Sequence, residues 1–161
     1  MAIDAFLKLE GVKGESVDKA HKDEIEVLSW SWGMSQTGTT HRGTGGGAGK
    51  VNVTDLTFMK YVDRSSPVLS QACCTGQHFP KATLSVRKAG GEPLDYLVIT
   101  LEDVLISSVQ TSGSQGDEMI MQSVSLNFGR FKESYQPQNA KGGKEGGAIE
   151  AGYNIATNEK I

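Results

Sequence analysis

The sequence has few of the features that mark disulfide-bonded, membrane-bound or nucleic-acid-binding proteins. Its two cysteines, Cys73 and Cys74, are neighbours, so a disulfide between them would be strained, and we expect free thiols and a reducing compartment. The chain of 161 residues carries 16 Lys and Arg against 19 Asp and Glu, which leaves no basic stripe for nucleic acid. No apolar run approaches the roughly 20 residues of a membrane span, so we expect no membrane insertion. Residues 1–8 lack the regions of a cleaved signal peptide, which predicts synthesis in the cytoplasm.

The sequence also lacks a complete nucleotide-binding motif. Gly49-Lys50 resembles the end of a phosphate-binding loop, but Thr44 occupies the position of the first glycine. Val51 follows the lysine, so the hydroxyl that would bind magnesium is missing. A dinucleotide fingerprint starting at Gly43 precedes a predicted strand, whereas it should open a helix. We therefore expect no nucleotide cofactor.

Hydrolase and metal motifs are likewise incomplete. The turn at 112–116 begins with serine, whereas a hydrolase elbow requires glycine there. Cys73, Cys74 and His78 do not make a zinc set, because we expect His21 and His41 to lie far away in flexible segments. The adjacent acids Glu102 and Asp103 would face opposite sides of a strand, which is typical of a solvated surface. These absences predict a protein that is not an enzyme and holds no metal.

What the sequence does contain is alternating apolar and polar residues, the pattern of half-buried β-strands. In the stretch 25–32, this period predicts that Trp30 and Trp32 face the core with Leu28, while Ser29 and Ser31 point the other way. The stretch 94–109 is long enough that we expect a bend or bulge in it. The same pattern predicts strands at 6–10, 25–32, 51–61, 81–88, 94–109 and 119–131.

One short helix is predicted after the third of these strands. Ser66 is a capping residue, Pro67 suits the first helical position, and Gly76 suits the end, which gives a helix of about ten residues. The apolar face of this helix is predicted to contain Val68, Leu69, Ala72 and Cys73. The fold class is thus mostly β, with one α-helix in a single domain covering 1–161.

Two segments are predicted to be irregular. The stretch 37–49 is rich in glycine and joins two strands, and loops of this length usually carry a function. The stretch 136–161 has many glycines and little apolar period, so we expect a loose C-terminal tail.

These features resemble those of the haemolysin-coregulated protein (Hcp) family, and they follow one another in the same order along almost the whole chain. The matching stretches are 6–16, 25–33, 49–51, 60–63, the helix from Ser66, 87–91 and 126–128. The resemblance implies a compact β-barrel of two antiparallel sheets with one flanking helix, similar to phage tail-tube proteins. It also implies a component of the type VI secretion system that forms hexameric rings and stacks them into a tube. Such a protein is exported without a cleaved signal peptide.

The implied partners are other copies of the chain, effector proteins held in the ring lumen, the spike at the tube tip and the contractile sheath. Small hydroxyl side chains suit a polar lumen, so we predict that Ser31 and Ser29 form the effector-binding lumen face. The alternative for both serines is a position that faces solvent or a neighbouring subunit, and for Ser29 this alternative is at least as well supported. We predict that the glycine-rich loop contacts the adjacent ring or subunit through His41, Arg42, Gly43, Gly45, Gly46, Gly47 and Gly49. Two alternatives are a monomeric β-barrel that binds a small ligand and an enzyme-bearing member of the family, for which the stretch 136–161 is too short.

Overall fold

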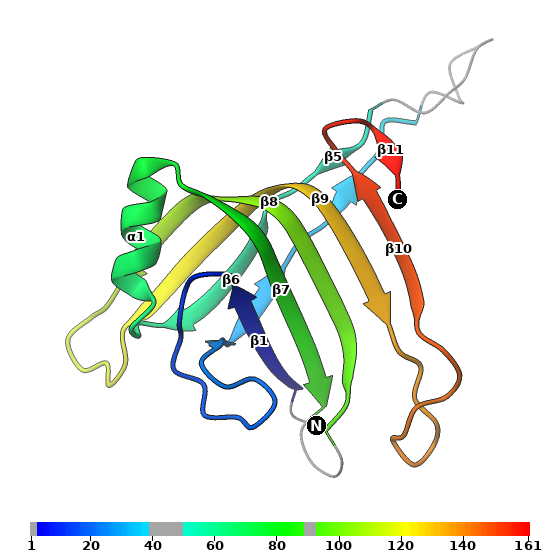
Figure 1. Ribbon diagram of the computed structural model, residues 1–161. Helices are drawn as coiled ribbons and strands as arrows, with labels where there is room; N and C mark the ends of the chain where they lie inside the picture. The colour runs from blue at the N-terminus through cyan, green and yellow to red at the C-terminus, as the bar shows by residue number, and fades with distance from the viewer. Residues whose placement is uncertain (1–2, 39–49, 89–92) are drawn as a thin grey trace.

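The computed structural model describes residues 3–38, 50–88 and 93–161, and within them it contains eleven strands and one helix (Figure 1). A mostly β fold with antiparallel sheets and one helix is therefore confirmed. The elements are β1 Ile3–Leu9, β2 Ile25–Val27, β3 Ser29–Ser31, β4 Met34–Ser35, β5 Asn52–Val53, β6 Leu56–Tyr61, α1 Ser66–Thr75, β7 His78–Lys88, β8 Asp95–Ser112, β9 Met121–Tyr135, β10 Ile149–Asn154 and β11 Glu159–Lys160.

The main sheet has nine strands, and it branches at β9. One path runs β11-β10-β9-β8-β7-β1-β2. The other runs from β9 to β6 and then to β3, because the first half of β9 pairs with β6 while its second half pairs with β10. The two branches face each other, with β1 and β7 on the near side and β6 behind them (Figure 1). A separate two-stranded sheet contains β4 and β5.

Apolar side chains from both branches fill the space between them. Leu7, Leu84 and Leu101 come from the near side, and Phe58 and Leu126 come from the far side, all essentially without solvent exposure. Trp32 closes this core at one end, with its ring 4.9 Å from that of Phe131 in an edge-to-face arrangement. Both Trp30 and Trp32 are half-buried against the core, as the strand period predicted.

The alternation around Trp30 is interrupted at one position. Ile25 and Val27 are buried, but Leu28 and Ser29 both lie on the exposed side before Trp30 turns back toward the core. This slip separates β2, which pairs with β1, from β3, which pairs with β6. The prediction that Leu28 shares the core face with the tryptophans is therefore wrong, and the rolled sheet is not closed by an unbroken ladder.

The helix α1 begins at Ser66 and ends before Gly76, whose φ of 70° is the left-handed conformation that glycine adopts without strain. Leu69 and Ala72 are buried as predicted, whereas Val68 is 43% exposed and faces outward. The cap position belongs to Ser65, so the predicted capping role of Ser66 is wrong. Within the described ranges, no helix has the length and apolar character to cross a membrane.

The hydroxyl of Ser66 instead belongs to a buried polar cluster. The ammonium group of Lys60, which is fully buried, lies 2.9 Å from Asp63, 3.0 Å from Ser66 Oγ and 3.1 Å from Gln122 Oε1. These three contacts satisfy all three donors of the lysine and fasten the start of α1 to β6 and β9.

Two further expectations concern the second half of the chain. The bulge predicted in the long strand is confirmed, because the register between β8 and β9 shifts between Ile106 and Ser108. The stretch 136–161 differs from the predicted loose tail, because β10 pairs with the second half of β9 and β11 pairs with β10. Hydrogen bonding along β9 orders this segment although its own apolar pattern is weak.

Candidate functional site

The outer face of the β3-β6-β9 branch is rich in hydroxyl groups. Ser29 lies opposite Met59, and Ser31 lies opposite Thr57, so each serine shares the outer face with its partner. The next strand continues these rows, because Thr57 pairs with Ser125 and Met59 pairs with Ser123. On β8 the rows end at Ser108 and Gln110. We call this set the hydroxyl face: Ser29, Ser31, Thr57, Met59, Ser108, Gln110, Ser123 and Ser125.

Ser29 and Ser31 are both exposed on this face. Two neighbouring residues on this face are hydrogen-bonded to each other, because the hydroxyls of Thr57 and Ser125 lie 2.9 Å apart across the paired strands. Apart from Met59 and Gln110, the face presents short hydroxyl groups that donate and accept hydrogen bonds, and the set contains neither an acid nor a base. It can bind polar surfaces of many kinds but offers no general acid or base for catalysis.

The other predicted contact residues, His41, Arg42, Gly43, Gly45, Gly46, Gly47 and Gly49, lie outside the residues that the structure describes. Their proposed role in stacking stays a prediction.

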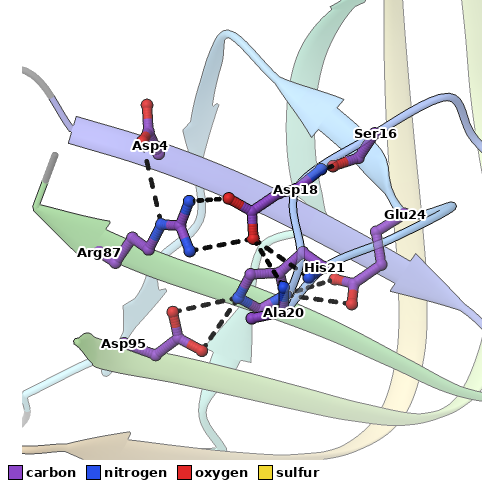
Figure 2. Close-up of polar contacts among 8 residues, drawn as sticks. All are labelled: Asp4, Ser16, Asp18, Ala20, His21, Glu24, Arg87 and Asp95. Carbon is purple, nitrogen blue, oxygen red and sulfur yellow. Dashed lines mark hydrogen bonds and ion pairs between the residues drawn. The ribbon is translucent and has the colours of Figure 1, made fainter. Parts of the chain in front are cut away.

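A cluster of charges that the sequence did not predict holds the loop between β1 and β2 against the sheet (Figure 2). Arg87, on β7, forms a two-pronged ion pair with Asp18 of the loop, in which Nη1 donates to Oδ1 at 3.1 Å and Nη2 contacts Oδ2. The guanidinium lowers the pKa of Asp18, chiefly through this hydrogen bond, and Asp18 in turn raises the pKa of Arg87. Asp4 approaches the same guanidinium at 3.9 Å from Nε.

His21 forms the second half of this cluster. Its Nδ1 lies 3.0 Å from a Glu24 oxygen, and its Nε2 lies 3.1 Å from both oxygens of Asp95 at the start of β8 (Figure 2). Both carboxylates find a donor only when each ring nitrogen carries a proton. The ring is buried and stacks on Phe6 with the centroids 4.5 Å apart. The prediction that His21 sits in a flexible segment is therefore wrong.

The arrangement of this charge cluster indicates a structural role. Arg87 also lies over the ring of Phe6, 5.0 Å from its centroid. The Phe6 ring therefore contacts both the guanidinium of Arg87 and the imidazole of His21. Arg87 and His21 each face carboxylates from two different segments. Such a cluster fixes the position of a loop, because separating the loop from the sheet would leave charges unpaired.

The paired acids and the cysteines occupy surface positions. Glu102 pairs with Arg130 at 2.6 Å, and Asp103 pairs with His78 at 3.2 Å, so each acid has a partner of its own. Cys74 is exposed, Cys73 is half-buried, and both are free thiols. In the parts of the chain that the structure describes, no three His, Cys, Asp or Glu side chains cluster as metal ligands.

Comparison with known proteins identifies the class to which this fold belongs. A family model described as "Type VI secretion system effector, Hcp" matches residues 6–135. A curated relative, Protein hcp1 of Pseudomonas aeruginosa, is 56% identical over 159 residues, which is 98% of both chains. The crystal structure of Hcp1 from Salmonella typhimurium is 44% identical, with full coverage of both chains and a TM-score of 0.83. A type VI secretion effector from Yersinia pestis is 32% identical, covers 94% of this chain and 99% of its own, and has a TM-score of 0.76.

The curated relative and the two solved structures match nearly the whole chain. The chain belongs to the Hcp family of type VI secretion proteins.

Proposed function

We propose that this protein is a structural subunit of the type VI secretion tube, assembled from homohexameric rings that stack, and that it carries effector proteins in the ring lumen. It acts by shape and surface chemistry and is not an enzyme. The observation that carries the proposal, beside family membership, is the hydroxyl face. Effectors with different surfaces can all hydrogen-bond to serine and threonine hydroxyls, which take up little space in a narrow channel.

The strand edges support assembly from identical copies. Among the described residues, β3 pairs only with β6, and the part of β8 from 107 to 112 pairs only with β9. Unpaired backbone groups at such edges favour pairing with another chain. The edges of β3 and of residues 107–112 flank the hydroxyl face. A head-to-tail contact between these two edges would repeat around a ring, and it would leave the hydroxyl faces of all subunits on the same side of the joined sheet.

The remaining parts of the proposal concern neighbouring components. The glycine-rich loop from His41 to Gly49 contacts the next ring of the stack. The spike at the tip and the contractile sheath are the other partners of the tube. The protein leaves the bacterial cytoplasm through this apparatus without cleavage of a signal peptide.

The experiment that tests the ring combines light scattering with particle imaging of the purified protein at micromolar concentration. We expect the mass of six chains and ring-shaped particles with six-fold symmetry. A mass equal to one chain, without rings on the grids, would instead favour a monomeric β-barrel that binds a small ligand.

Export is tested in cells. We expect the intact chain in culture supernatants of wild-type cells and its loss from supernatants of cells that lack the contractile sheath. Equal amounts in both supernatants, or a shortened N-terminus on the exported chain, would contradict export by this route.

A further inference from the structure

The imidazole of His21 lies between two carboxylates from different parts of the chain (Figure 2). Its Nδ1 is 3.0 Å from Oε1 of Glu24 in the same loop, and its Nε2 is 3.1 Å from both oxygens of Asp95 on β8. A neutral imidazole has one donor and one acceptor, whereas the protonated ring has two donors. Only the protonated ring satisfies both carboxylates, and a neutral ring would point a lone pair at one of them.

Burial makes the loss of this proton costly. His21 is only 6% exposed, and the side chain of Glu24 is 14% exposed, so water cannot readily replace a lost donor there. In the part of the chain that the structure describes, the side chain of Glu24 makes hydrogen bonds only with His21. A partly buried carboxylate without its donor is strongly disfavoured. Removing one proton from the ring would therefore weaken the attachment of the loop to the sheet.

The neighbouring charges do not replace this proton. Asp18 accepts a hydrogen bond from the backbone N–H of His21 at 3.2 Å, but its carboxylate is paired with Arg87 of β7. Arg87 is the cross-strand neighbour of Asp95, yet its two Nη atoms contact Asp18. The charge cluster thus holds four carboxylates and two cations: Asp4, Asp18, Glu24, Asp95, Arg87 and His21. A neutral His21 would leave Arg87 as its one cation.

Two lysines lie beside this cluster without joining it. Lys19 of the loop and Lys144 line the same groove as Asp95, and within the described ranges neither forms an ion pair with it. Each is free to remain in water, where an ammonium group is well solvated. The charge on His21 therefore has no substitute among the groups packed around it.

The loop between β1 and β2 is built to move as a unit. Its two sides are joined at the base by backbone hydrogen bonds, from Gly14 N–H to the carbonyl of Asp23 at 2.7 Å and from Ser16 N–H to the carbonyl of Glu24 at 3.0 Å. A side chain at Gly14 would collide with the backbone of Glu24, so the base stays narrow. These bonds hold the loop to itself, whereas the charge cluster holds it to β7 and β8.

We propose that His21 is a proton-dependent latch, which holds this loop against β7 and β8 while its ring is protonated and releases the loop when the ring loses a proton. Rising pH therefore opens the latch, and histidines usually change charge between about pH 5 and 8. The Arg87–Asp18 pair responds in the opposite direction, because it needs an ionised carboxylate. Release would uncover the buried ring of Phe6 and open a groove of about 700 Å³ that the loop forms with residues 93–95 and 134–148.

Hydrogen exchange of the full chain, followed by mass spectrometry of peptides that cover residues 16–24, measures the opening of the loop. The two conditions are about pH 5.5 and about pH 8.5, on either side of the usual range for histidine. Each rate is divided by the intrinsic rate of an unfolded peptide at the same pH. We expect the corrected rate to be at least about tenfold faster at the higher pH, because a partly buried carboxylate has then lost its donor. The test does not depend on the ring proposed above.

Asp95→Asn separates the latch from a merely structural role of His21. The amide can accept from a protonated ring nitrogen through its oxygen or donate to a bare one through its NH2 group, so this variant should hold the loop closed at both pH values. His21→Gln should leave the loop open at both, since its amide cannot donate to two carboxylates on opposite sides. The matched control is His78→Gln, because His78 also contacts a carboxylate, that of Asp103 at 3.2 Å, but is exposed. This control should behave as the unmodified chain does.

The protonation state of the ring is measured independently by 15N NMR of the full chain labelled at histidine, with the signals of His21 identified by their loss in His21→Gln. Both ring nitrogens should carry a proton while the loop is closed. A neutral ring in the closed loop would overturn the proposal. So would equal corrected exchange of the unmodified chain at the two pH values. An unchanged pH response in Asp95→Asn would show that another group controls the loop, which also overturns the latch.

Discussion

Arg87 near the end of β7 and Asp18 in the loop after β1 are 69 positions apart in the sequence, yet they form a two-pronged ion pair. The pair depends on the carboxylate being ionised, because a protonated carboxyl group loses its charge and one acceptor oxygen. It therefore links the position of the loop to pH.

The direction of this dependence follows from the pKa of Asp18, which Arg87 holds below the ordinary value of 3.8. In the unfolded chain Asp18 takes up a proton near that ordinary value, and in the folded chain it does so only at lower pH. The stability from the pair is therefore fully present above about pH 4 and is lost as the pH falls through the folded pKa.

We predict that Asp18→Asn makes the stability less dependent on pH in the acid range. The free energy of unfolding of the two proteins should differ at pH 6 and converge as the pH falls below 4. Urea unfolding at a series of pH values measures this. A constant difference from pH 6 down to pH 2 would show that the ionised pair contributes nothing.

A second prediction concerns the buried lysine. Replacing Lys60 with Met removes three donors at once and leaves Asp63 and Gln122 without their partner. We expect a loss of about 3 kcal/mol in the free energy of unfolding, near the lower end for breaking a buried ion pair, because Asp63 still accepts hydrogen bonds from Ser65. Urea unfolding at neutral pH measures the loss.

The matched control is Lys132→Met, which breaks a pair with Glu150 of 3.3 Å in which both side chains are about half exposed. An exposed pair is worth less than about 1 kcal/mol, so this variant should be nearly as stable as the unmodified chain. Equal losses in the two variants would contradict the special role of the buried cluster.

Local patterns predicted much of this fold from the sequence. The strand period placed Phe58, Leu84 and Leu126 in strands, and Gly76 ended the helix as expected. The burial of Lys60 was not predicted, although Lys60 alternates in phase with the buried Leu56 and Phe58 on β6. This alternation indicates a buried side chain even before its partner Gln122 is known. The correct predictions share one property: the sequence signal for each lies within a few neighbouring positions.

The failures depend on contacts between distant segments. The slip at Leu28 arises where the chain leaves β1 for β6, and no run of apolar and polar residues encodes that exchange of partners. The order of β10 comes from the backbone of β9. The burial of His21 requires Asp95, 74 positions away, so a polar loop sequence could not reveal it. The hydroxyl face was predicted only at Ser29 and Ser31, because its other members come from β6, β8 and β9.

A third prediction concerns the glycine-rich loop. Replacing residues 41–49 with a tight turn should leave single rings folded and should weaken stacking and secretion, if this loop contacts the adjacent ring. Particle imaging distinguishes separate rings from tubes, and supernatant blots measure secretion. Tubes and secretion at unmodified levels would contradict the proposed role of His41, Arg42 and the glycines that follow them.

The last prediction concerns cargo binding at the hydroxyl face. Ser31 is exposed and lies opposite Thr57, so Ser31→Gln adds a longer side chain to this face without entering the core. We expect rings of unchanged mass that retain less of a co-expressed effector, because the added side chains narrow the lumen from every subunit at once. Ser31→Thr is the matched control, since it keeps the hydroxyl and adds only one methyl group, and it should retain the effector. Full retention by Ser31→Gln rings would place Ser31 away from the cargo. Loss of the ring itself would instead place Ser31 in a contact between subunits, as expected for a residue on the free edge of β3, and would contradict its assignment to the lumen.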